Sequence, residues 1–243
     1  MSLPEQYKKW VERVSNVVSF AYPFKGTDAE RRYKMWLKDN NIPEKEYIET
    51  AQEMWTEVHN ALDDYVVKWD IALSPPLSAD VAREIEHWIA FLNTLDTEEI
   101  YTEKYAIDKL ERYQWTCDLL YKTKEWQWVL SDWKTFWICQ KRFPQLAPKK
   151  VQKDWLPAIA WGKKDKVRMQ MSLYAKAIKE TEGIEISKLS LLFVHENWVR
   201  EVVFDPVPDE EIEAFLEAYR LSLIATPLLN KKTIMSFKAP LSI

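Results

Sequence analysis

The chain has 243 residues, of which 47% are hydrophobic, and a formal net charge of −4. That length and apolar content are enough for one hydrophobic core with a helical side lobe. No apolar run approaches the roughly 20 residues of a membrane span, and the N-terminal stretch lacks the apolar segment of a secretory signal. We therefore expect a soluble, cytoplasmic protein that does not enter a membrane.

Helical signals dominate residues 1–95. Pro43 and the acids after it start a helix in which apolar residues recur at helical spacing as far as Val66. Ser74 and the two prolines that follow it interrupt this pattern. Ser78 can then cap a second helix that runs to Leu92.

Strand-like runs begin near residue 103. We expect strands at 104–110, 113–122 and 127–136, a basic loop at about 141–160, a helix at 167–180 that ends near Gly183, a hairpin of strands 189–195 and 198–204, and a last helix from 208 to about 223. This order predicts an α/β fold in which a mixed β-sheet is flanked by helices, with a helical region at the N-terminus.

Basic residues are concentrated in one segment, although the chain as a whole is acidic. Between positions 141 and 168, nine Lys and Arg stand against two Asp, so the segment carries +7 and the remainder of the chain −11. Such a patch can bind a phosphate backbone, and the alternative is a solvated basic loop. The candidate DNA-binding residues are Lys149, Lys150, Lys153, Lys163, Lys164, Lys166 and Arg168.

A carboxylate and a lysine are expected to share one strand face. Side chains alternate along a strand, so Asp132 and Lys134 project to the same side, and Asp118 lies fourteen residues upstream of Asp132 in the preceding strand. Two carboxylates held close together favour a hard cation such as Mg²⁺, which can polarise a phosphodiester while a lysine neutralises developing charge. The alternative is an ordinary solvated Asp–Lys pair, because D-x-K arises by chance about once in such a chain.

Four further residues accord with a site of this kind. Gln170 and Tyr174 are spaced i, i+4 on the helix after the basic segment, so they project from one face. His59 lies among apolar helix neighbours and is either a buried core histidine or a metal ligand. Glu103 starts the first strand and can add another carboxylate.

In this order, the motifs resemble those of RecB-like nucleases in the PD-(D/E)XK superfamily, a group that includes recombination and phage exonucleases. The matching segments are Trp55-Thr-Glu-Val-His59, Trp115-Thr-Cys-Asp118, Ser131-Asp-Trp-Lys134-Thr135 and Gln170-Met-Ser-Leu-Tyr174. The resemblance covers about residues 50–205 and implies a restriction-endonuclease-like sheet.

The resemblance also implies the roles of individual residues. His59, Asp118, Asp132 and the Trp133 carbonyl would hold Mg²⁺ or Mn²⁺, and Lys134 would be the catalytic lysine. Gln170 and Tyr174 would support the site or contact DNA. Independently of the resemblance, Glu103 is a candidate additional acid. Cys117 and Cys139 are too few for the iron–sulfur cluster that some members carry, so we expect none.

The expected function is that of a metal-dependent DNA nuclease, of the exonuclease type, in recombination, repair or phage DNA processing. Residues 1–95 would form a helical region with the histidine motif, 96–225 the nuclease core and 226–243 a tail. The partner would be DNA, in a bacterial or phage-infected cell, with room for a helicase or a single-strand-annealing protein beside it. The alternatives are a catalytically inactive DNA-binding module of the same fold and a helical adaptor in which D-x-K is coincidental.

Tryptophan is abundant and glycine scarce, with 13 Trp and 3 Gly, whereas average usage gives about 17 Gly. Trp55 and Trp115 stand where the family has glycine, and Trp126, Trp128 and Trp198 occupy turn-like places. We hypothesise that many of these residues are glycines whose UGA codons were read as tryptophan, since some genetic codes assign UGA to glycine. The alternative is a protein that uses its tryptophans to stack on bases. Trp133, within the D-x-K-T motif, is expected to be a genuine tryptophan.

Overall fold

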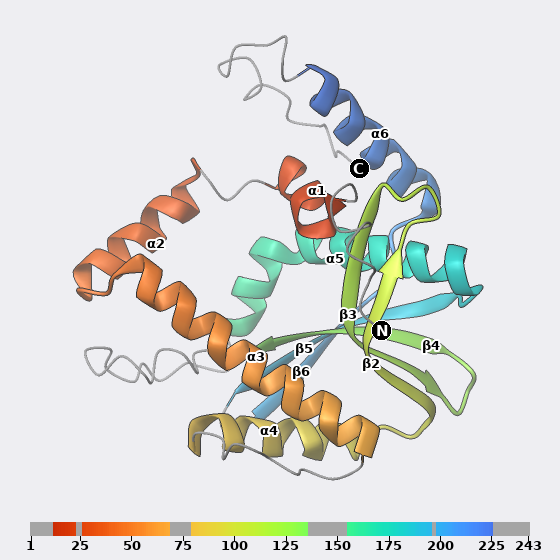
Figure 1. The fold of residues 1–243 in the computed structure, drawn as a ribbon, viewed down its shortest axis with the longest axis horizontal. Coiled ribbons are helices and arrows are strands. Elements are labelled where there is room, and N and C mark those ends of the chain that lie inside the picture. Colours follow the sequence, from red (N-terminus) through yellow and green to blue (C-terminus); the bar gives the residue numbers. More distant parts are fainter. Residues whose placement is uncertain (1–11, 23–25, 69–78, 136–154, 196–197, 226–243) are drawn as a thin grey trace. The chain divides into compact units, whose positions relative to one another are not determined.

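The computed structural model describes residues 12–22, 26–68, 79–135, 155–195 and 198–225, and the chain divides into two compact units, Met1–Pro206 and Val207–Ile243. The helices of the first unit are α1 (Val14–Ala21), α2 (Asp28–Asp39), α3 (Glu44–Lys68), α4 (Ala79–Leu92) and α5 (Trp155–Glu182) (Figure 1). Its strands are β1 (Glu12–Arg13), β2 (Thr97–Ile107), β3 (Tyr113–Thr123), β4 (Trp128–Thr135), β5 (Ile186–His195) and β6 (Trp198–Phe204). The second unit contains α6 (Asp209–Ala225).

One mixed sheet runs through the first unit. Its strand order is β1-β3-β4-β5-β6, and β2 also pairs with β3. The β2–β3, β3–β4 and β5–β6 pairs are antiparallel, whereas β4 and β5 are parallel, with α5 in the connection between them. The predicted α/β fold, a mixed sheet flanked by helices and preceded by a helical region, is thereby confirmed.

Two predicted segments, the first strand and the basic loop, have wrong boundaries. β2 begins at Thr97 and ends at Ile107, not at 104 and 110, because it pairs with β3 along nearly its whole length, and that ladder outweighs the polar character of its first residues. The basic loop expected at 141–160 is helical from Trp155. Pro157 does not prevent this, because proline is tolerated in the first turn of a helix. The remainder of that loop, through residue 154, lies outside the described residues.

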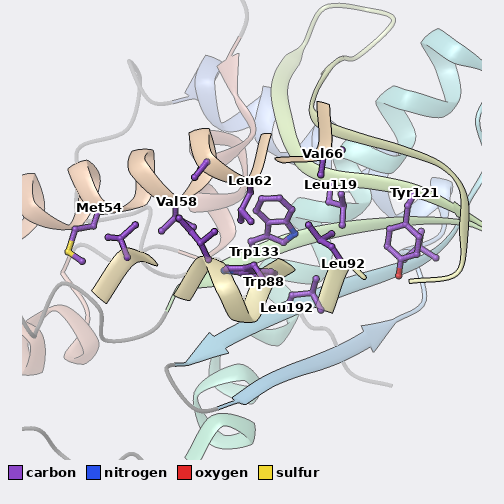
Figure 2. Close-up of a cluster of buried hydrophobic side chains, with 14 residues drawn as sticks. Met54, Val58, Leu62, Val66, Trp88, Leu92, Leu119, Tyr121, Trp133 and Leu192 are labelled. Carbon is purple, nitrogen blue, oxygen red and sulfur yellow. The ribbon is translucent and has the colours of Figure 1, made fainter. Parts of the chain in front are cut away.

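Helices α3 and α4 cover one face of the sheet. Both helices show apolar residues at helical spacing, and these residues interlock with side chains of β3, β4 and β5 in one buried cluster (Figure 2). At its centre the rings of Trp88 and Trp133 lie 5.0 Å apart, and both side chains are essentially inaccessible to solvent. Trp133 is thus a core residue, as expected of a genuine tryptophan.

Helix α5 packs against β2, β3, β4 and β5. Leu130 alternates along β4 with the α4-facing Val129, so it points to the opposite face, and it is also fully buried. The Tyr113 hydroxyl donates a hydrogen bond to the Leu173 carbonyl of α5 at 3.1 Å. The centre of the sheet is therefore covered on both faces, which fixes the strands that carry the predicted site.

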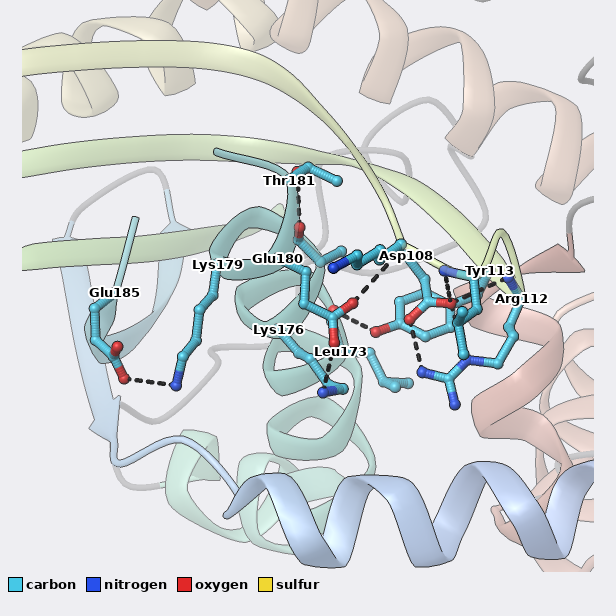
Figure 3. A network of polar contacts seen from close by, with 12 residues as sticks. Asp108, Arg112, Tyr113, Leu173, Lys176, Lys179, Glu180, Thr181 and Glu185 are labelled. Carbon is cyan, nitrogen blue, oxygen red and sulfur yellow. Dashed lines mark hydrogen bonds and ion pairs between the residues drawn. The ribbon is translucent and has the colours of Figure 1, made fainter. Parts of the chain in front are cut away.

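A polar network holds the β2–β3 turn closed and ties it to α5 (Figure 3). The Asp108 carboxylate accepts hydrogen bonds from the Arg112 guanidinium at 2.8 Å and from the Leu110 N–H at 3.1 Å. Glu180 of α5 accepts from the Lys109 N–H at 3.2 Å. Burial raises the pKa of Asp108, but these hydrogen bonds outweigh it and the net pKa is lowered. The turn is thus anchored by a carboxylate that stays ionised.

The second unit is described by itself. Helix α6 has three acids, Asp209, Glu210 and Glu211, in its first turn, where they interact favourably with the helix dipole. Across the described parts of the chain, no helix has both the length and the apolar character required to cross a membrane.

The β3–β4 hairpin places Trp126 in a backbone conformation that favours glycine. Its φ is +64°, its N–H donates to the Thr123 carbonyl at 2.9 Å, and the Thr123 N–H donates to Gln127 at 2.9 Å. A three-residue hairpin loop of this kind ordinarily has glycine at that left-handed position. The side chain is 69% exposed, so no core packing calls for tryptophan. Trp55 and Trp115 lie within α3 and β3, and neither has a positive φ.

We predict that Trp126→Gly stabilises the protein. Relief of the left-handed strain, about 1–2 kcal/mol, should exceed the loss of the cation–π contact with Lys122, which lies 3.8 Å from the ring and contributes about 0.5–1 kcal/mol. Thermal unfolding should show a Tm higher by about 2–4 °C, as a gain of about 1 kcal/mol gives in a chain of this size. Trp128, expected in the turn, is instead the first residue of β4 and has no positive φ, so Trp128→Gly should lower the Tm and serves as the control. An equal decrease in both variants would contradict the glycine assignment.

Candidate metal and catalytic site

The predicted site residues meet where β3 and β4 separate. These strands pair only from Leu119–Ser131 to Lys122–Trp128, although β3 begins at residue 113 and β4 continues to residue 135. One edge of β3 is taken by β2, and β1 reaches only Tyr113 and Gln114 on the other edge. Among the described strands, residues 115–118 of β3 and 132–135 of β4 are thus not paired with each other. We call this gap the strand fork.

Asp118 lies in the strand fork and is almost fully buried. Its Oδ2 accepts a hydrogen bond from the Trp133 N–H of β4 at 2.7 Å, and its Oδ1 lies 3.8 Å from the His59 Nδ1 of α3. Burial, followed by the negative charge of Asp132, raises the pKa of Asp118 to about 7. A carboxylate in this position binds a proton unusually tightly and is available to a cation once the proton leaves.

His59 reaches the strand fork from α3, and Glu103 reaches it from β2. The two residues lie 44 positions apart, yet His59 Nδ1 and Glu103 Oε1 are 2.7 Å apart. The ligand atoms of His59, Glu103 and Asp118 all lie within 4.8 Å of one another, close enough for one cation to contact all three. The ring of Trp55, one helical turn before His59, lies 3.8 Å from the imidazole between centroids and covers it.

Asp132 and Lys134 form an ion pair on the adjoining strand, as their alternate spacing predicts. Asp132 is 4% exposed. Burial lowers the pKa of Lys134, but the negative charges of Asp132 and Asp118 outweigh it, so the net pKa is raised. Lys134 therefore remains an ammonium at neutral pH. It can orient water or neutralise an anion, but it cannot act as a general base.

Gln170 and Tyr174 lie on α5 and are hydrogen-bonded to each other, Gln170 Nε2 to the Tyr174 hydroxyl. Burial and then the charge of Asp132 raise the pKa of Tyr174 well above its ordinary value, so the phenol stays protonated. Trp115 stacks parallel to the Tyr174 ring, with centroids 5.8 Å apart. The structure thus brings the Gln–Tyr pair next to the carboxylates, on the α5 side of the sheet.

The structure describes the side chains of only some of the candidate DNA-binding residues. Lys149, Lys150 and Lys153 lie outside the described residues, and Lys163 and Lys164 lie on α5 without a described side chain. The Lys166 ammonium lies 3.5 Å from Ser19 Oγ and from the Tyr22 carbonyl, next to α1. Arg168 donates to the carbonyls of Asp205 and Pro206 at 2.8 and 3.2 Å. The Arg168 guanidinium therefore supports the chain after β6 in this structure.

Sequence reasoning missed a polar contact beside the site. The Thr102 hydroxyl of β2 donates a hydrogen bond to Asp63 of α3. Asp63 is four residues after His59, so both side chains project from the same helix face towards β2. The H-x-x-x-D spacing of His59 and Asp63 is visible in the sequence and could have indicated that both side chains reach the site.

The charges of the cluster favour a divalent cation. Glu103, Asp118 and Asp132 are three carboxylates, whereas Lys134 is the one ammonium paired with them among the described residues. The carboxylates therefore outnumber the ammonium, and one divalent cation would balance the excess of acidic groups. The Nδ1 of His59 lies 2.7 Å from the Glu103 Oε1 and 3.8 Å from the Asp118 Oδ1. The residues present therefore fit a Mg²⁺ or Mn²⁺ site with oxygen and imidazole ligands.

Comparisons with known proteins add little to this geometry. Neither a protein-family model nor a curated protein matches the chain. Among solved structures, the chain is similar to one described as "Crystal structure of SSO0001", with 13% sequence identity and a TM-score of 0.33. That similarity covers 77% of this chain and 85% of the other. A likeness at this level says nothing about activity.

We predict that the protonation of Asp118 links stability to pH. Its pKa is about 7 in the folded chain, against about 3.9 when unfolded, so the folded state holds the proton more tightly. This contribution to stability is fully present below the unfolded pKa and is lost as pH rises through about 7. The Tm of the wild type should fall between about pH 4 and pH 7 more steeply than that of Asp118→Asn, measured by thermal unfolding without metal. Equal slopes would show that Asp118 is ionised throughout.

Proposed function

We propose that this protein is a Mg²⁺- or Mn²⁺-dependent deoxyribonuclease that hydrolyses phosphodiester bonds, of the exonuclease type, in recombination, repair or phage DNA processing. One observation carries the proposal. His59 of α3, Asp118 of β3, and Asp132 and Lys134 of β4 come from three elements and converge at the strand fork. This is the order and the set of residues that the resemblance to RecB-like nucleases implies.

The proposed roles follow from the positions of the side chains. His59, Asp118 and Asp132, with the Trp133 carbonyl, would hold the cation, which when bound polarises the phosphodiester and lowers the pKa of a water molecule. The Lys134 ammonium, kept charged by its neighbours, would orient the attacking water and neutralise the developing negative charge. The hydrogen-bonded Gln170–Tyr174 pair would support the site from α5.

The burial of the carboxylates argues against the adaptor alternative. Asp118 and Asp132 are 5% and 4% exposed, and burying charged groups destabilises a fold unless they are paired or bind a metal. A surface used only for protein contacts would not require two carboxylates to be buried at a cost in stability. A cation-binding site, with chemistry at the cation, would account for their burial.

DNA is the proposed partner, on the basis of the basic segment and the resemblance. A helicase or single-strand-annealing protein would supply unwinding or strand handling, because the chain has no G-x-x-x-x-G-K-[ST] phosphate-binding loop. This part of the proposal depends on the nuclease assignment.

Degradation of linear DNA tests the function. The wild type should shorten end-labelled duplex or single-stranded DNA with Mg²⁺ or Mn²⁺ and not with EDTA. Lys134→Ala should reduce the rate about 100-fold or more, as removal of one charge-stabilising donor does in other enzymes. Because Trp55 and Trp115 stand at family glycine positions, the assay should be repeated with both changed to glycine.

The matched control is Lys188→Ala. Lys188 lies on the neighbouring strand β5 and also pairs with an acid, Asp205, at 2.6 Å, but away from the strand fork. Its replacement should leave cleavage unchanged. If neither the wild type nor the glycine version cleaves DNA while both are folded and bind it, the catalytically inactive DNA-binding module becomes the better description.

A further inference from the structure

Glu103 is the one acid of the cluster that strand alternation does not explain. Consecutive residues of a strand face opposite sides of the sheet. Yet Thr102 contacts Asp63 and Glu103 contacts His59, and both partners lie on α3. The next residue, Lys104, pairs with Glu182 of α5. Two adjacent side chains of β2 therefore reach the same helix.

A left-handed backbone at Glu103 produces this arrangement. Its φ is +47°, although β2 keeps its register with β3 on both sides, from Thr102 opposite Leu119 to Lys104 opposite Cys117. That register places Glu103 directly across from Asp118. A non-glycine residue in this conformation costs on the order of 1–3 kcal/mol, and such strain is found mainly where function requires it. The distortion directs a carboxylate to His59 and Asp118.

Among the described residues, Glu103 is also the sole polar group within hydrogen-bonding distance of the His59 imidazole. Within the described residues, the hydrogen bonds of His59 are limited to the 2.7 Å contact between Nδ1 and Glu103, and Nε2 has none. The ion pairs of Glu103 are likewise limited to His59. The Glu103 side chain is 37% exposed, whereas those of His59 and Asp118 are 4% and 6% exposed. A cation arriving from solvent would therefore meet Glu103 first.

We propose that Glu103 is itself a metal ligand, so that His59 Nδ1, Glu103 and Asp118 hold a divalent cation in common. The imidazole nitrogen favours Mn²⁺ over Mg²⁺, because nitrogen ligands suit transition metals. This proposal rests on the metal site of the proposed function, but not on cleavage of DNA.

Titration of the full chain with Mn²⁺, followed by electron paramagnetic resonance of the free ion and by calorimetry, tests the proposal. Glu103→Gln retains an oxygen that can accept from Nδ1 but loses the negative charge. It should weaken Mn²⁺ binding roughly 10- to 100-fold, a range typical for losing a group that supports a metal. Glu103→Ala should weaken it at least as much. The matched control is Glu99→Gln on the same strand, where the acid pairs with Lys122, and its affinity should equal that of the wild type.

The outcomes distinguish Glu103 as a metal ligand from Glu103 as a positioning residue. Normal Mn²⁺ affinity in Glu103→Gln with a loss in Glu103→Ala would overturn the ligand assignment and leave Glu103 a positioning residue for His59. Normal affinity in both variants would overturn any role in metal binding. Glu103-dependent Mn²⁺ binding without DNA cleavage would support this proposal while the nuclease assignment fails. DNA cleavage by the wild type, together with a Mn²⁺ affinity that does not depend on Glu103, would support the nuclease assignment and overturn this proposal.

Discussion

The hydrogen bond from the Trp133 N–H to the Asp118 carboxylate is the contact on which the arrangement of the site depends. It joins β3 to β4 where their backbone ladder has already ended. The Asp118 carboxylate therefore accepts the hydrogen bond that a backbone carbonyl would otherwise accept. The strands can separate without leaving the Trp133 N–H unsatisfied. The gap that results admits His59 from α3. It also keeps Asp118 buried and near Asp132, and burial, followed by the charge of Asp132, raises the pKa of Asp118.

Packing on both faces of the sheet stabilises the strands around the strand fork. On one face, Trp133 packs against Trp88 within the cluster shared by α3, α4 and the sheet. On the other face, α5 is held to the β2–β3 turn through Glu180. Because the sheet is covered on both faces, the strand fork is rigid enough to hold two buried carboxylates close together. Their repulsion then favours binding of a proton or a divalent cation over an empty, fully charged state.

Among the described residues, four that are not glycine have a positive φ, namely Asn41, Glu103, Glu111 and Trp126, and Glu103 and Trp126 contrast in what surrounds them. At Glu103, the left-handed residue brings a carboxylate to His59, and the proposed metal site would give this strain a chemical use. At Trp126, the left-handed residue is an exposed tryptophan in a hairpin loop that ordinarily contains glycine. No contact found there requires the indole beyond its position over Lys122. The proposed site would use the left-handed backbone at Glu103, whereas the hairpin loop only tolerates it at Trp126.

The sequence by itself determined the α/β class, the pairing of Asp132 with Lys134 on one strand face and that of Gln170 with Tyr174 on one helix face. These follow from periods of two and about four residues, which are local properties of strand and helix. Only the tertiary structure decided that β2 begins at Thr97, that β3 pairs with β4 only from Leu119 onward, and that Glu103 meets His59. Those features depend on pairing between segments far apart in the chain and on a φ angle that no local pattern reveals. The sequence therefore supplied the reactive groups, and long-range pairing placed them around one point.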